Sequence, residues 1–381
     1  LKYFIPFQNQ HFINEWSSLI KFSDGISNID EYAASRKEYI RDEINRDVTT
    51  WEANNCVLGT WLGNEIGDMG WSEFRELLTE LCDNKSLNDC IFYYNRRDNP
   101  VLSKTRSEPY NHLYNSYTEP LKSHSYDTYI PILGYCNNNN FADQLIPTYA
   151  DWRDITKKYY PTSCQNMNVS EINHNWNTKY PIAVFRGSAT GCGVTPESND
   201  RIGISLISKA LRDRGNNGIL DAGLTGFNSR DKKMSGGPVS FFKYRDYGFE
   251  KADRISMNDQ SNFKYIVHID GHVSAYRLGK ELSLGSTIIK IKSRGNYKVW
   301  FSDQLIKLEK DLSNKEIANY IELESPRNII PMLQFLRSRD DIAQSLARNA
   351  LNLYNRLITR DNIFNYMENL INKVSKNYYS E

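Results

Sequence analysis

Apolar side chains recur at two different spacings along the chain, and these spacings predict an alternation of helices and strands. Residues 71–82 (WSEFRELLTELC) carry apolar side chains three and four positions apart, as on one face of a helix. Residues 89–95 (DCIFYYN) form a short apolar run that predicts a strand, ended by the turn sequence RRDNP. Residues 129–135 (YIPILGY) predict another short strand, and residues 149–155 (YADWRDI) open another helix. The amino-terminal third is therefore predicted to be an α/β unit.

The same alternation appears twice in the second half of the chain. Residues 181–215 combine an apolar run, a glycine-rich loop and a helical stripe, and Gly215 is predicted to end that helix. Residues 265–291 (YIVHIDGHVSAYRLGKELSLGSTIIKI) follow the same order, with a turn at Asp270-Gly271-His272 and a second apolar run at the end. Two strand–loop–helix units in one half predict a mostly parallel sheet with right-handed crossovers.

The length of 381 residues exceeds the size at which a single core stops growing, so two domains are expected. A polar, irregular stretch places the junction near residue 175, which gives a first domain at 1–175 and a second at 176–349. Two further helices are predicted to begin near Asp341 and Asp361, each with the Asp as its N-cap.

The composition narrows the class of protein. The net charge of +1 argues against a nucleic-acid binder that works by general electrostatic attraction. The apolar residues, 40% of the chain, are enough to build large cores, and no apolar stretch is long enough to cross a bilayer. The six cysteines are too sparse for a disulfide scaffold. The chain starts without Met or the apolar core of a signal peptide, as a trimmed or excised domain is expected to.

Two loops carry residues suited to an anion. In open α/β sheets, ligands bind where strands end and helices begin, and the free N–H groups there favour phosphate. The loop sequences FRGSATGCG and DGHVSAYR each combine glycine with a hydroxyl (Ser188, Ser274) and an arginine (Arg186, Arg277). Arg277 is expected about one turn into a helix, from where its guanidinium can reach back to a diphosphate. The alternative is a surface ion pair for Arg277, with glycines that serve only the turns.

The other motifs argue against several classes of enzyme and identify one candidate catalytic residue. Neither loop matches the P-loop or the G-x-G-x-x-G fingerprint, which argues against NTPases and dehydrogenases. Asp98, just past a predicted strand end, is a candidate general base; the alternative is an Asp-Asn-Pro turn with solvated Arg96 and Arg97. His268 and His272 lie four residues apart, but across a strand-to-turn boundary, so they do not share a helix face. No metal site is predicted.

Three segments in the same order resemble glycosyltransferase family 90, which includes protein O-glucosyltransferases and fungal capsular xylosyltransferases. FYYNRRDNP is similar to a family strand that ends in R-D-x-P, and PIAVFRGSAT to a strand that ends in an F-R-G-S/T loop. Residues 265–290 resemble the family's most recognisable block, and the resemblance runs from roughly residue 85 to 375. The lengthened loop ATGCGVTPE resembles versions found in large DNA viruses, which also suits a composition rich in Asn, Lys, Ile and Tyr.

The resemblance implies a GT-B fold, in which two Rossmann-like domains face each other across a cleft and carboxyl-terminal helices cross back to the first. Helices from about residue 350 to 381 then complete the acceptor-side domain, and the second domain binds the donor. Asp98 matches the family's catalytic base. The candidate donor-binding residues are Tyr160, Arg186, Gly187, Ser188, Arg201, Gly271, His272, Val273, Ser274, Ala275, Tyr276 and Arg277.

The activity that the resemblance implies is inverting, metal-independent transfer of a sugar, glucose or xylose, from a UDP-sugar to a hydroxyl of a protein or glycan. It needs no further cofactor. Two alternatives stay open: a catalytically inactive GT-B-like module that binds a nucleotide or glycan, and a GT-B transferase that uses another nucleotide sugar. A viral member is expected in the host cytoplasm, viral factory or virion, and a eukaryotic-type member in the ER lumen. The poorly matching amino-terminal third leaves the acceptor open.

Overall fold

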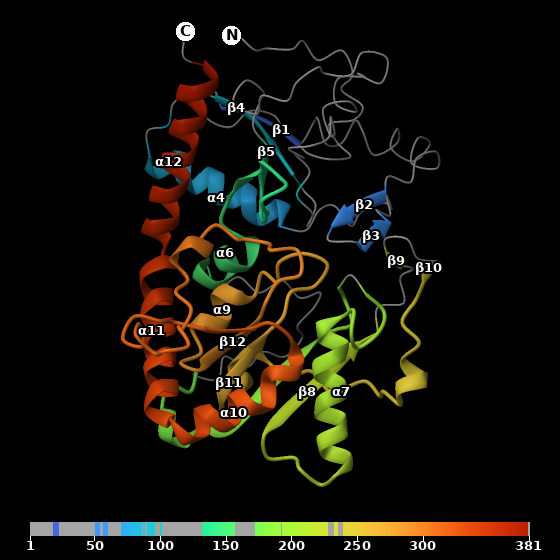
Figure 1. Ribbon diagram of the computed structural model, residues 1–381. Coiled ribbons are helices and arrows are strands. Elements are labelled where there is room, and N and C mark those ends of the chain that lie inside the picture. Colours follow the sequence, from blue (N-terminus) through green and yellow to red (C-terminus); the bar gives the residue numbers. More distant parts are fainter. Residues whose placement is uncertain are drawn as a thin grey trace.

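The computed structural model describes residues 18–22, 50–53, 56–59, 70–85, 87, 90–95, 100, 132–156, 172–191, 193–227, 232–234 and 239–379, which form three sheets and a set of helices (Figure 1). The strands are β1 Ser18–Phe22, β2 Thr50–Ala53, β3 Cys56–Gly59, β4 Cys90–Tyr94, β5 Ile132–Gly134, β6 Gln144–Leu145, β7 Tyr180–Ser188, β8 Leu220–Gly226, β9 Lys232–Met234, β10 Val239–Ser240, β11 Phe263–His268, β12 Thr287–Ile291 and β13 Ile321–Leu323. The α-helices are α4 Trp71–Asn84, α6 Tyr149–Thr156, α7 Asp200–Asp213, α8 Met257–Gln260, α9 Leu278–Leu282, α10 Ile329–Ser338, α11 Asp340–Leu357 and α12 Arg360–Tyr379.

The largest sheet has the order β13-β12-β11-β7-β8, and each neighbouring pair of strands is parallel. This confirms the predicted α/β class and the mostly parallel sheet. Side chains along each strand alternate between two buried clusters because successive residues point to opposite faces. Val184 of β7 and Ile266 of β11 join one cluster with α9, while Phe185 and Val267 join the other with α10.

A smaller sheet has the order β1-β4-β5-β6, with β1 antiparallel to β4 and the other pairs parallel. The terminal helices connect it to the parallel sheet: α11 packs on β12 and α9, and α12 continues to β4 and α4 (Figure 1). One continuous apolar core therefore spans both sheets, from Phe74 of α4 through Trp152 of α6 to Ile288 of β12.

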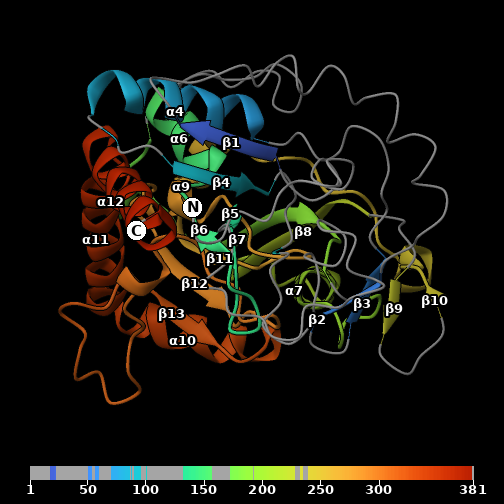
Figure 2. The same cartoon turned by 90° about the horizontal axis from the view of Figure 1, so that it is seen from above.

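The third sheet, β10-β9-β3-β2, is antiparallel and joins segments that lie far apart in sequence. Its strands β2 and β3 come from the amino-terminal third, and β9 and β10 follow β8. Figure 2 shows this sheet and the helices α11 and α12 on opposite sides of the parallel sheet. No helix in the described part of the chain is both long enough and apolar enough to span a membrane.

The long periodic segments fold as predicted and Gly215 follows the end of its helix as expected, but the two predicted N-caps are wrong. Helix α7 ends at Asp213, and Gly215 follows with a φ of 75°, a left-handed conformation that suits glycine. Asp341 and Asp361 lie inside the first turns of α11 and α12, so neither is the N-cap. They still complement the positive end of each helix dipole there. Helix α10 and strand β8 were not expected from the pattern.

Arg277 was expected about one turn into a helix, and this expectation is wrong. Helix α9 begins at Leu278, with Arg277 at its N-cap, so Arg277 is not one turn into a helix. The residues before it form turns because Asp270 accepts the backbone N–H of Ala275 through Oδ1 at 3.0 Å. The short polar side chain thus competes with the helix for this N–H group.

Candidate functional site

Two loops leave the same edge of the parallel sheet, because β7 and β11 are parallel neighbours. The first loop (residues 189–199) follows β7, and the second loop (residues 269–277) follows β11. The loops that the sequence singled out are therefore brought together. This edge is where open α/β sheets bind their ligands.

Arg201, from the first turn of α7, joins the two loops. Its guanidinium donates to Oγ1 of Thr190 at 2.6 Å and to the carbonyl oxygen of Ser188 at 3.2 Å, at the start of the first loop. It also donates to the carbonyl oxygens of Ile269 and Asp270, each at 2.9 Å, in the second loop. The side chain is almost entirely buried, so its loss would separate the loops.

Arg277 lies beside Arg201 and makes this edge cationic. Both guanidinium groups lie over the ring of Phe185, with their central carbons 5.3 Å and 5.9 Å from its centre. Burial, followed by the charge of Arg277, lowers the pKa of Arg201 to about 9. None of the hydrogen-bond partners of Arg201 in the described residues is a carboxylate. The carboxylates of Asp270 and Glu281 offset part of this charge. A pair of neighbouring guanidinium groups still favours a bound anion.

Arg277 itself is held from two sides. Its Nε lies 2.8 Å from Oε1 of the fully buried Glu281, and its Nη1 donates to the carbonyl oxygen of Arg186 at 2.5 Å. The side chain keeps 27% of its surface exposed, so the guanidinium is held in place but remains accessible to a ligand. This is the state expected of an arginine that receives a ligand.

The side chain of Arg186 turns away to β8. Its Nη2 donates to both carboxylate oxygens of Asp221, at 3.0 Å and 2.8 Å, and its Nε donates to the carbonyl oxygen of Asp253. Its backbone oxygen, rather than its guanidinium, faces Arg277. The geometry therefore favours a supporting role for the Arg186 side chain.

Two of the candidate donor-binding residues, Gly187 and Gly271, lie so close to Arg201 that a side chain there would be crowded. A Cβ at Gly271 would lie 3.0 Å from Oγ1 of Thr190 and 3.4 Å from Nη2 of Arg201. A Cβ at Gly187 would lie 3.0 Å from the ring of Phe185 and 3.4 Å from Nη1 of Arg201. These glycines let the two loops close around the arginine, whether or not they also contact a ligand.

The second loop buries two of its candidate residues in the core. Val273 and Tyr276 are more than nine-tenths buried and pack into the core that spans both sheets. Only their backbone is available to a ligand, whereas His272, Ser274 and Ala275 are partly exposed. The ring of Tyr276 contacts the rings of Tyr135 and Tyr149 edge-on, at 5.7 Å and 5.6 Å, which fixes the loop to the smaller sheet.

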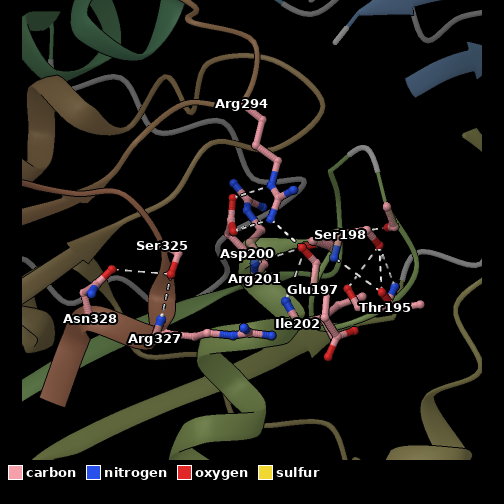
Figure 3. A network of polar contacts seen from close by, with 12 residues as sticks. Thr195, Glu197, Ser198, Asp200, Arg201, Ile202, Arg294, Ser325, Arg327 and Asn328 are labelled. Atoms are coloured by element: carbon pink, nitrogen blue, oxygen red, sulfur yellow. Dashed lines mark hydrogen bonds and ion pairs between the residues drawn. The ribbon is translucent and has the colours of Figure 1, made fainter. Parts of the chain in front are cut away.

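A small pocket of about 30 Å³ lies between the two loops and the end of β12, and its lining includes Gly271, His272 and Arg294. Arg294 donates to both oxygens of Asp200, each at 2.8 Å (Figure 3). Both residues also line a wider neighbouring hollow of about 400 Å³. His272 accepts the N–H of Gly191 through Nδ1 at 3.3 Å, which ties the first loop to the lining of the small pocket.

Asp98 and Tyr160 lie outside the described residues, so their predicted roles stay predictions. The described residues nearest to Asp98 in the sequence are Asn95, directly after β4, and Pro100. Tyr94 and Tyr135 share a 2.5 Å hydrogen bond between their hydroxyl oxygens, and Tyr135 contacts the second loop through Tyr276. The end of β4 therefore lies near that loop.

Sequence reasoning missed three residues that shape this edge: Asp270, Glu281 and Arg294. Arg294 follows β12, the next parallel strand, so the rule that ligands gather at the carboxyl ends of strands pointed to it. Asp270 had a signal too, because Asp directly after a strand readily accepts nearby N–H groups. Glu281 had none, since a glutamate on a helical segment is ordinarily solvated.

Comparison with known proteins supplies an independent view. The family described as Glycosyl transferase family 90 matches residues 113–380. "Uncharacterized protein 035R" of Invertebrate iridescent virus 3 is 27% identical over 100% of this chain and 35% of its own length, so the chain spans about a third of that relative. "Uncharacterized protein 179R" of Invertebrate iridescent virus 6 is 28% identical over 98% of this chain and 35% of its own length.

A human relative and a solved structure are more distant. Human "Protein O-glucosyltransferase 1" is 24% identical over 65% of this chain and 57% of its own length. Among solved structures, sucrose-phosphate synthase from Thermosynechococcus elongatus has 11% identity and a TM-score of 0.33, over 79% of this chain and 62% of that one. The viral relatives agree with the similarity to viral members expected from the sequence.

Proposed function

Since this chain belongs to glycosyl transferase family 90, we propose that it moves a sugar from a UDP-sugar to a hydroxyl of a protein or glycan. Glucose or xylose is the proposed sugar, and the proposed reaction inverts the anomeric carbon without a metal ion. The relatives named as O-glucosyltransferases support glucose as the first donor to test.

The observation that carries the proposal is the cationic edge between the two loops. Arg201 and Arg277 lie side by side over Phe185, next to a pocket lined by Gly271 and His272. A diphosphate is doubly charged and planar guanidinium groups bind its oxygens in pairs, so this edge suits the leaving group of a nucleotide sugar.

The proposed mechanism uses one base and this edge. The carboxylate of Asp98 takes the proton of the acceptor hydroxyl while that oxygen attacks the anomeric carbon from the face opposite UDP. The bond from the anomeric carbon to the diphosphate oxygen breaks, and its electron pair leaves with UDP. Arg277 stabilises the charge that develops on the diphosphate.

We further propose that the chain adopts the GT-B arrangement, with domains at 1–175 and 176–349. The two sheets that α11 and α12 connect support this proposal, because α12 returns from the parallel sheet to β4. The pocket beside the second loop then belongs to the donor side. Acceptors approach from the side of β4, where Asp98 follows Asn95 by three residues.

A panel of nucleotide sugars tests the donor directly. A ligand that binds the folded chain raises its unfolding temperature by mass action, so UDP-sugars are expected to raise it and GDP- and CMP-sugars are not. Slow release of free sugar from the same UDP-sugar then separates an enzyme from a binding module. Stabilisation without any hydrolysis or transfer favours the inactive module, and the absence of stabilisation contradicts the proposal.

The base is tested by Asp98→Asn, with Asp213→Asn on an exposed turn of α7 as the control. Loss of a general base lowers the rate by about 10²-fold or more, so Asp98→Asn is expected to bind UDP-glucose normally and to lose transfer. Asp213→Asn is expected to keep both. Transfer at the wild-type rate by Asp98→Asn would remove Asp98 from the mechanism.

A further inference from the structure

A series of buried polar groups runs beneath the second loop. Glu281 places Oε2 at 2.5 Å from Nδ1 of His268 and Oε1 at 2.8 Å from Nε of Arg277. The other ring nitrogen of His268 lies 3.4 Å from Oδ1 of Asp270, and that oxygen also accepts the N–H of Ala275. The series therefore connects the end of β11, the backbone of the second loop and the arginine at the start of α9.

The number of protons on His268 decides whether this series is complete. A protonated imidazole has two N–H donors, one for Glu281 and one for Asp270, whereas a neutral imidazole has only one. Glu281 is fully buried and the side chain of Asp270 keeps only 12% of its surface exposed. Loss of the proton therefore removes one imidazole contact from a carboxylate in a place that water hardly reaches, although Asp270 keeps the N–H of Ala275 and Glu281 keeps Arg277 beside it.

The remaining charges around His268 come from three elements. Lys290 of β12 lies beside it in the sheet register and acts on Asp270. Arg277, at the start of α9, acts on Glu281, and Arg201 of α7 acts on both carboxylates. The nearby Arg186 of β7 is engaged at β8. These cations balance the carboxylates in part, but none of them replaces an imidazole N–H between Glu281 and Asp270 in the described residues.

The electrostatics agree with a bound proton near neutral pH. Burial opposes charge on the imidazole, but the charges and hydrogen bonds of Glu281 and Asp270 outweigh it and raise the pKa of His268 above 6.5. The same contacts keep both carboxylates ionised: their pKa values are lowered although burial opposes this. The proton is thus retained to a higher pH than on an ordinary imidazole.

We infer that His268 and Glu281 are positioning residues of the donor site, which hold the second loop and Arg277 in place only while His268 is protonated. Deprotonation releases the contact to Asp270 or Glu281, loosens the loop and weakens binding of the donor diphosphate. The inference rests on the proposed function, since the ligand is taken to be a nucleotide sugar. Neither residue touches the reacting atoms in this account.

Calorimetric titration with UDP-glucose from about pH 6 to pH 8.5 tests the inference, because the diphosphate of this ligand carries no group that titrates there. The wild-type affinity is expected to fall about tenfold with rising pH, the size of a lost charged hydrogen bond. His268→Gln and Glu281→Gln are expected to bind more weakly and with a flat profile. Asp213→Asn, an exposed carboxylate on α7, is the control and is expected to follow the wild type.

A second measurement needs neither a variant nor a ligand. Amide hydrogen exchange at Ala275, corrected for the intrinsic effect of pH, reports whether its N–H stays bonded to Asp270. Protection is expected to fall as His268 loses its proton. Constant protection, or variant profiles parallel to the wild-type profile, would overturn the inference alone. Failure of the wild type to bind UDP-glucose at any pH would instead overturn the proposed donor, and the exchange of Ala275 would still decide whether His268 fixes the loop.

Discussion

Asp270 and Asp151 are both carboxylates with little exposure to solvent, yet their surroundings shift their pKa values in opposite directions. Asp270 lies at the edge of the parallel sheet, where burial is outweighed by the hydrogen bond and charge of His268, so its pKa falls to about 2. Asp151 lies in α6, where burial prevails over hydrogen bonds from Trp300 and Thr148 and raises its pKa to about 6. Asp270 is thus stabilised by a charged partner, whereas the hydrogen-bond donors to Asp151 are neutral.

The contacts of Asp151 show how closely α6 packs against α9. Oδ2 accepts hydrogen bonds from Trp300 Nε1 at 2.9 Å and Thr148 Oγ1 at 2.8 Å, while the buried Oδ1 has no hydrogen-bond partner among the residues that the structure describes. A Cβ at Gly279 of α9 would lie only 2.1 Å from Oδ1, so α6 and α9 meet with no space between them. Close packing of this kind holds α6 and α9 together, whereas the cationic edge retains capacity for an anion.

The largest expected effect on stability comes from Asp270→Asn, which removes the charge that His268 and the nearby cations stabilise. A pKa lowered from 3.8 to about 2 corresponds to about 2 kcal/mol at neutral pH, and the variant is expected to unfold more easily by that amount. The contribution is present above pH 3.8 and is lost as the pH falls through about 2. Urea unfolding near pH 7.5 measures it, and an unchanged free energy of unfolding would contradict the charged network.

A smaller effect of opposite sign is expected from Asp151→Asn. The raised pKa means that the native state prefers the protonated carboxyl, so its stabilising contribution is present below pH 3.8 and is lost as the pH rises through about 6. A pKa raised from 3.8 to about 6 corresponds to about 3 kcal/mol, but the amide mimics the protonated carboxyl only in part because this end of the side chain lies tightly against Gly279 of α9. The variant is therefore expected to be more stable than the wild type by about 1–2 kcal/mol near pH 7.5 and equal near pH 4. Parallel unfolding curves at the two pH values would show that Asp151 is not a strained charge.

The sequence predicted those parts of the fold that local periodicity determines. Helices α4 and α7 and strands β7, β11 and β12 occur where the apolar spacing placed them. Helix α10 was missed, because Pro331 within its sequence normally marks a boundary; in its first turn a proline is tolerated. The N-caps of α11 and α12 were misassigned because a carboxylate favours the whole first turn, and Thr359 takes the capping position of α12.

The candidate site shows more clearly that local sequence patterns do not reveal long-range contacts. The sequence identified both loops and Arg277, because the chemistry of strand ends is local. It did not identify the partner that holds Arg277, since a glutamate four residues along is ordinarily a surface ion pair. Glu281 is buried here by the packing of α9 against α6 and α11, a long-range contact that no local pattern contains.

Binding of UDP-glucose to Arg277→Ala tests the central claim that the edge between the two loops holds the donor diphosphate. The variant is expected to lose about ten- to a hundredfold in affinity, the size of one or two charged hydrogen bonds, and Arg277→Lys is expected to recover only part of it. Arg337→Ala is the matched control, because Arg337 donates to the carbonyl oxygens of Pro181 and Gly218 at the opposite edge of the same sheet. Wild-type affinity in Arg277→Ala, or an equal loss in both alanine variants, would contradict the account.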